Sequence, residues 1–372
     1  MSNRGIIMCV KAHQTRFERP LDKAVPRLYF IAMLFIKRGD LDQLLESLKG
    51  DYRVYVPRAM GNGTGYSLLG ESNSDFIIGE IRSFDPLKSF FFLGREKVAE
   101  DYSPEIPRDT KPPCIVGAKA CDLKGFKILD FVFMDEDYGD PTYIRSRKEG
   151  LIISADCTGV GENCFCTAVD VNPWPEADFD LNLSPVDGGF MVAVGSDKGR
   201  KLIKDHSGLF IEKDDQDLIE KVKANRSDIR KRVARNAQKK AIPSFERLKR
   251  IVQKQYEEAD IWKECSEDCV ECGACNTICP TCHCFLLYDQ KDDGKLARFR
   301  VWDSCMIQDF ARVAGGENPR DNLWMRLRNR FDKKFNYFPE VADEIACTGC
   351  GRCIAACPGK IDIREVLARL EV

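Results

Sequence analysis

The chain has 372 residues, 44% of them apolar, with 57 Lys and Arg against 59 Asp and Glu. This length allows two or three domains, and the net charge of −2 gives no general attraction to nucleic acid or to membranes. No run approaches the roughly twenty apolar residues of a membrane-spanning helix, and residues 1–14 do not resemble a signal peptide, so we expect a cytoplasmic globular protein.

Residues 1–210 carry mixed helix and strand patterns and are predicted to form an α/β domain. A helix is expected from Asp40, as its N-cap, to Gly50, because leucines recur on one face at positions 41, 44, 45 and 48. Strands are predicted over 52–56, 114–116, 151–153 and 190–194. Asp122 is expected to cap the helix after the second of these strands. The glycine run 61–66 lacks the spacing of a phosphate-binding loop and is interpreted as a flexible loop.

Residues 211–262 are predicted to be a helical, basic linker. Between positions 221 and 254 there are thirteen Lys or Arg and two acids. We interpret this stretch as solvated connecting helices, with a docking face for an acidic partner as the alternative. Nucleic-acid binding is not expected, because no aromatic side chains are interleaved with the basic ones.

Eighteen cysteines are many for a chain without a secretion signal, and twelve of them lie in residues 265–372. Disulfides do not persist in a reducing compartment, so clustered cysteines there more often bind metal. The three histidines, His13, His206 and His283, argue against haem or histidine-rich zinc chemistry.

Two segments follow the spacing C-x2-C-x2-C-x3-C-P of ferredoxins that hold two clusters. They run from Cys269 to Pro280 and from Cys347 to Pro358. In this pattern three closely spaced thiolates hold one [4Fe–4S] cluster, and the fourth reaches the other cluster. The first cluster is therefore predicted to take Cys269, Cys272, Cys275 and Cys357, and the second to take Cys347, Cys350, Cys353 and Cys279.

The predicted fold class is thus α+β, in three parts. The N-terminal α/β domain covers residues 1–210, the linker covers 211–262, and a dicluster ferredoxin-like domain covers 263–372. The last domain contains an insert, 281–346, between its two motifs. Two close clusters are typical of one-electron transfer.

Several motifs together resemble the iron–sulfur electron-transfer chain of anaerobic sulfite reductase and the β subunit of soluble sulfhydrogenases. They are CVECGACNTICPTCHCF, VWDSCM, AGGENPR and CTGCGRCIAACP, joined upstream by segments 117–122, 140–145 and 164–166. The resemblance covers most of the chain from about residue 110. That family has Arg-Pro before the Cys-Asp pair, where this chain has Lys119 and Ala120.

The resemblance implies an iron–sulfur electron-transfer subunit of an anaerobic oxidoreductase complex. Its partners would be a flavoprotein subunit that oxidises NAD(P)H and a catalytic subunit. The latter would hold sirohaem or nickel–iron, or be like heterodisulfide reductase. The chain itself would perform no substrate chemistry.

The segment DCTGVGENCFC, residues 156–166, places three cysteines far from the ferredoxin motifs. Loops at the carboxyl ends of neighbouring parallel strands converge, so these cysteines and one from the preceding loop are expected to meet. They are Cys121, Cys157, Cys164 and Cys166. The interpretation is a third [4Fe–4S] cluster. Free core cysteines, a zinc site and a disulfide are the alternatives.

The remaining cysteines have weaker interpretations. Cys265 is taken as a spare thiol, while Cys282, Cys284 and Cys305 either pack around the clusters or bind a further metal. An alternative function is a flavin-containing catalytic subunit that uses the N-terminal domain, with the ferredoxin domain as electron outlet. A flavin is not expected, because no nucleotide-binding motif supports it. A third alternative is a scaffold whose clusters only stabilise the fold.

Overall fold

The structure is a computed structural model, and it describes residues 34–71, 76–103, 110–213 and 215–371. The chain divides into two compact units, residues 1–30 and residues 31–372. All described residues belong to the second unit. Residues 1–14, which include His13, lie outside them.

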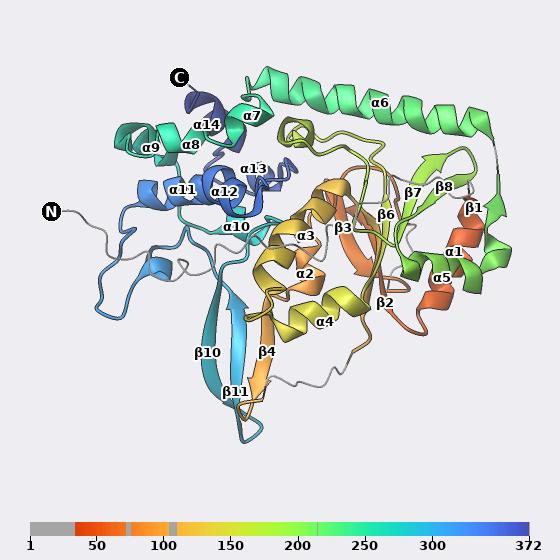
Figure 1. The fold of residues 1–372 in the computed structure, drawn as a ribbon, viewed down its shortest axis with the longest axis horizontal. Coiled ribbons are helices and arrows are strands. Elements are labelled where there is room, and N and C mark those ends of the chain that lie inside the picture. Colours follow the sequence, from red (N-terminus) through yellow and green to blue (C-terminus); the bar gives the residue numbers. More distant parts are fainter. Residues whose placement is uncertain (1–33, 72–75, 104–109, 214, 372) are drawn as a thin grey trace. The chain divides into compact units, whose positions relative to one another are not determined.

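The N-terminal half is built on one eight-stranded sheet, with strand order β3-β2-β5-β6-β7-β8-β1-β9 (Figure 1). The four strands β2, β5, β6 and β7 are parallel to one another, and the outer strands pair antiparallel. The strands are β1 Leu34–Lys37, β2 Arg53–Met60, β3 Gly63–Leu68, β5 Pro113–Ala118, β6 Leu151–Ala155, β7 Leu181–Val186, β8 Gly189–Val194 and β9 Ile211–Glu212.

Alternation along the central strands divides the core into two layers. Cys114 and Val116 of β5 pack with the leucines of α1, whereas Ile115 packs with α3 on the opposite face. Successive side chains of a strand point to opposite faces, so a strand buried on both sides is apolar throughout. The helices of this half are α1 Arg38–Leu48, α2 Lys88–Phe91, α3 Ala120–Phe133, α4 Pro141–Glu149 and α5 Asp197–Asp205, with the 3-10 turn η1 Cys166–Val169.

The C-terminal half is mainly helical and has its own core. Trp262, Phe331 and Phe335 are fully buried there, and Phe165 and Cys166 of the N-terminal half belong to the same cluster. The helices are α6 Gln216–Lys239, α7 Phe245–Leu248, α8 Ile251–Lys254, α9 Ala259–Ser266, α10 Ala274–Thr277, α11 Leu323–Asp332, the π-helical turn η4 Lys333–Tyr337, α12 Phe338–Ala342, α13 Arg352–Ala355 and α14 Ile363–Arg369.

A second sheet joins the two halves through three antiparallel strands, β10 Phe285–Asp292, β11 Lys295–Trp302 and β4 Arg95–Glu100. The hairpin β10–β11 comes from the insert between the cysteine motifs, while β4 precedes β5 of the large sheet (Figure 1). Buried Arg300 of β11 contacts Glu96 of β4 at 2.6 Å and also pairs with Asp140 at the start of α4. The insert is therefore attached to the N-terminal half by both backbone and charge.

The mixed α+β class and the helical character of the basic linker are confirmed. The leucines of α1 are buried, and strands occupy the four predicted positions. Three local expectations were wrong. Asp40 lies inside the first turn of α1, whose N-cap is Lys37, and Asp122 lies inside α3, whose N-cap is Lys119. The run 61–66 is the turn and first half of β3, paired with β2, and not a flexible loop.

Across the described ranges, no helix combines the length and apolarity needed to cross a bilayer.

Candidate iron–sulfur sites

Both ferredoxin motifs fold in the same local way. Each has a glycine in the left-handed region, Gly273 at φ +70° and Gly351 at φ +71°, directly before a short helix. These helices, α10 and α13, carry the third cysteine of each motif and contact each other. A side chain at either glycine would be strained at this φ, so the glycines fix the turn that wraps the first three cysteines around one centre.

All four cysteines predicted for the first cluster line one cavity. Its wall contains Cys269, Cys272, Cys275 and Cys357, together with apolar side chains such as Leu327 and Phe331. The backbone N–H of Ile361 points at Cys357 Sγ, at 3.4 Å. A set of four thiols in an apolar wall, with an N–H directed at one sulfur, fits a cluster whose sulfurs accept hydrogen bonds. Cys353 of the second motif also lines this cavity.

The cysteines predicted for the second cluster also lie near one another. Burial raises the pKa of the Cys347 thiol to about 12, and the neighbouring Cys353 and Cys279 thiols add to the increase. Buried Lys334, from η4, contacts Cys279 Sγ at 3.4 Å and donates to Thr281 Oγ1 at 2.9 Å. A thiolate ligand at Cys279 would balance the positive charge of Lys334.

All four cysteines predicted for the third cluster line a second cavity. Cys121 lies at the start of α3 after β5, Cys157 follows β6, and Cys164 and Cys166 lead into η1. Because β5 and β6 are adjacent parallel strands, their following loops meet at one edge of the sheet. Burial raises the pKa of the Cys157 thiol to about 11, so binding to a metal would be needed to hold it as a thiolate at neutral pH.

The second ferredoxin motif forms part of the same cavity, which no sequence pattern indicated. Gly349 and Cys350 complete its wall. The N–H of Phe165 donates to the Gly349 carbonyl at 2.8 Å. A Cβ on Gly349 would collide with the backbone of Cys166, and one on Gly351 would collide with the Asn163 carbonyl. The loop 163–166 and the second motif are therefore packed backbone to backbone.

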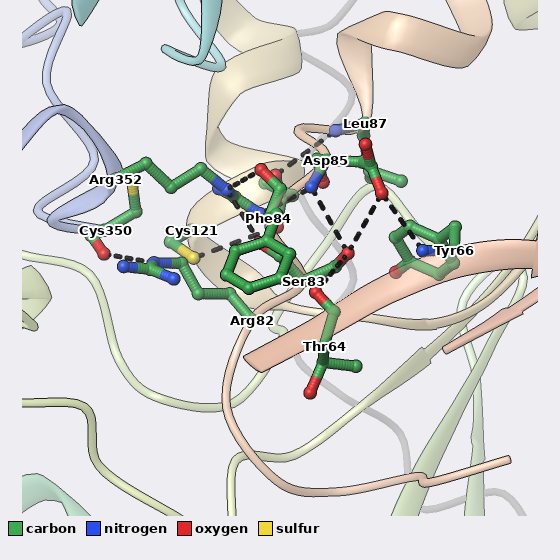
Figure 2. A network of polar contacts seen from close by, with 11 residues as sticks. Thr64, Tyr66, Arg82, Ser83, Phe84, Asp85, Leu87, Cys121, Cys350 and Arg352 are labelled. Atoms are coloured by element: carbon green, nitrogen blue, oxygen red, sulfur yellow. Dashed lines mark hydrogen bonds and ion pairs between the residues drawn. The ribbon is translucent and has the colours of Figure 1, made fainter. Parts of the chain in front are cut away.

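A buried polar network fixes this junction, and Figure 2 shows it around Arg352, which lies between Cys350 and Cys353. Arg352 Nη2 pairs with Asp122 Oδ2 at 2.8 Å, next to Cys121, and the Nε donates to the carbonyls of Ser83 and Phe84 at 2.9 and 3.1 Å. Arg82 in turn donates to the Cys350 carbonyl.

Sequence reasoning missed Arg352. A cation between the second and third cysteines of the motif was the available sign, but nothing local indicated its partner. Its Nη1 is buried and has no hydrogen-bond partner in the described part of the chain. The charges of Cys350 and Cys121 are close enough to affect this guanidinium. A buried N–H without an acceptor is costly, and cluster sulfur near these cysteines would be an acceptor. The residues present therefore fit an iron–sulfur cluster in the second cavity.

Comparison with known proteins agrees with this arrangement. Residues 268–361 match the sequence profile of the 4Fe-4S dicluster domain family. The chain is 32% identical over 329 residues to sulfhydrogenase 2 subunit beta of Pyrococcus furiosus, covering 87% of this chain and 94% of that protein. It is 21% identical over 185 residues to F420-dependent formate dehydrogenase subunit beta of Methanocaldococcus jannaschii, covering 50% of this chain and 39% of that protein.

Fold and sites together define an iron–sulfur protein of the electron-transfer class, with a 4Fe-4S dicluster domain at its C-terminal end. The chain belongs to the sulfhydrogenase subunit beta family. The predicted resemblance to that family is confirmed, while the individual ligand assignments stay predictions.

Proposed function

We propose that this chain relays single electrons through three [4Fe–4S] clusters, held by the three predicted cysteine sets. The observation that carries the proposal is the double role of the second ferredoxin motif. Its Cys353 lines the first cavity and its Cys350 lines the cavity of the third set. One short segment therefore borders all three sites, which supports a continuous path for electrons.

When bound, iron–sulfur clusters supply one-electron redox chemistry. The protein's own contribution is to bind, enclose and charge-balance these groups. Phe331 and Leu327 exclude water from the first site. Buried Lys334 beside Cys279 favours the more negative, reduced form at the second site, and Arg352 does the same between the second and third.

Electrons would pass to or from a partner at the first site. Cys272 is exposed there, and neighbouring Val270 has 64% of its surface accessible. The cysteines of the third set are more enclosed. By analogy with relatives named as subunits of hydrogenase and formate dehydrogenase, the partners would be a flavoprotein that oxidises NAD(P)H and a catalytic subunit. The catalytic centre would be of the nickel–iron, sirohaem or heterodisulfide-reductase-like type.

The test is flavin analysis and EPR of the chain purified alone without oxygen, during stepwise reduction with dithionite. A relay predicts no stoichiometric flavin, and several cluster signals that broaden through mutual coupling as neighbouring clusters become reduced. Stoichiometric flavin would favour a catalytic flavoprotein instead. Clusters that stay oxidised throughout would contradict electron transfer and favour a scaffold.

A further inference from the structure

Three cysteines outside the predicted ligand sets gather at the base of the β10–β11 hairpin. The N–H of Asp303 donates to the Cys284 carbonyl at 3.0 Å and closes the hairpin. This brings Cys305 beside Cys284, and the two thiols hydrogen-bond to each other. Cys282, two residues before Cys284, completes the group.

One buried side chain connects all three thiols. Asn276 in α10 is 1% exposed. Its Nδ2 donates to Cys305 Sγ at 3.1 Å, and its Oδ1 accepts from Cys282 Sγ at 3.5 Å. Cys282 and Cys305 are thus neighbours of a single amide group, and Cys284 contacts Cys305. These residues come from three separate segments of the chain, so the grouping follows from the tertiary fold.

Buried cations surround this thiol group. Lys88, Arg330 and Lys334 are 3%, 5% and 4% exposed. Lys88 Nζ donates to the carbonyls of Asn276 and Cys282 at 3.1 and 2.9 Å, and Arg330 Nε donates to Asn276 Oδ1 at 3.1 Å. Among the described residues none of the three cations contacts a carboxylate. Burying a charge without an opposite charge costs several kcal/mol.

Neutral cysteines would leave these cations uncompensated. The second cluster accounts for Lys334, which contacts its predicted ligand Cys279. Lys88 and Arg330 instead contact Asn276 and Cys282, on the side of the three thiols. Metal-bound thiolates keep their negative charge when buried, because the metal replaces the proton.

We infer that Cys282, Cys284 and Cys305 bind a metal centre as thiolates, in addition to the three clusters of the proposed function. Thiolate ligands select soft or borderline metals, which in proteins means chiefly the iron of an iron–sulfur cluster or zinc. This inference depends on the proposed function only through the position of Cys279 in the second cluster.

The test compares iron, zinc and acid-labile sulfide per chain in anaerobically purified wild-type protein and in a Cys282→Ser/Cys284→Ser/Cys305→Ser variant. Serine retains the size and hydrogen bonding of cysteine but is a poor ligand for these metals. The control is Cys265→Ser, which removes a buried thiol whose charged neighbour is Arg369 and not this group.

The triple variant is expected to lose about four irons with their sulfide, or about one zinc, while Cys265→Ser loses neither. The element that is lost identifies the metal. Metal content equal to that of the control would overturn the inference. If the triple variant does not fold, Cys284→Ser alone is measured in the same way, with the same two outcomes. Absence of dicluster EPR signals from the wild type would contradict the proposed function instead.

Discussion

Arg352 and Asp122 form a fully buried ion pair, 2.8 Å from Nη2 to Oδ2, although 230 residues separate them in the chain. It joins the second ferredoxin motif to the helix that begins beside Cys121. The same guanidinium binds three carbonyls of segment 83–85. One side chain thus connects the dicluster domain, the third candidate site and the loop between β3 and α2.

Replacing Arg352 with Met should destabilise the protein strongly, because Asp122 would be left buried without its opposite charge. The free energy of unfolding is expected to fall by about 3–5 kcal/mol, measured by denaturant unfolding under anaerobic conditions. Adding Asp122→Leu should recover part of this loss, since no buried charge then remains unpaired. A double variant that is less stable than Arg352→Met would show that the lost ion pair is not the cause.

Gly351→Ala should separate the third site from the dicluster domain. The alanine would combine a positive φ with a collision against the Asn163 carbonyl, next to Cys164. Gly188→Ala is the matched control, because Gly188 has φ +80° but open space around its Cα. The control should lose about 1 kcal/mol from backbone strain alone, and Gly351→Ala clearly more. Equal losses would show that the backbone contact contributes nothing.

Lys334→Met should lower the reduction potential of the second cluster. Loss of a cation beside Cys279 disfavours the more negative, reduced state. At an effective dielectric constant near 20 the change is on the order of 100 mV. Redox titration followed by EPR measures it, with Lys334→Arg as the charge-retaining control. An unchanged potential in the Met variant would place the second cluster away from Lys334.

Glu344 should make stability depend on pH at the acidic end. Burial raises the pKa of this carboxyl, but Lys124 and Lys127 of α3 outweigh burial and lower it overall. A lowered folded-state pKa means that the stabilisation is present above the unfolded value, about 4.3, and is lost as pH falls through the folded-state pKa. Glu344→Gln should remove this dependence, by about 1 kcal/mol. An identical pH profile for variant and wild type would count against the interaction.

The sequence predicted those parts of the sites that depend on local spacing. The two ferredoxin motifs are repeats with fixed ligand intervals, and the meeting of Cys121 with Cys157 follows from adjacent parallel strands. Contacts between distant segments could not be predicted. Asp122 looked like a helix cap because it precedes an apolar helical face, yet α3 begins two residues earlier and Asp122 pairs with Arg352. The pairing of β4 with β11 likewise has no local indication.

The measurement that tests the central claim most directly is iron and acid-labile sulfide per chain in a Cys157→Ala/Cys164→Ala/Cys166→Ala variant. It is compared with anaerobically purified wild type and with Cys114→Ala, a buried thiol in β5 outside all candidate sites. A three-cluster relay predicts that the triple variant loses about four irons and four sulfides, while the control loses none. Iron and sulfide contents unchanged from the wild type would contradict it and confine the clusters to the C-terminal domain.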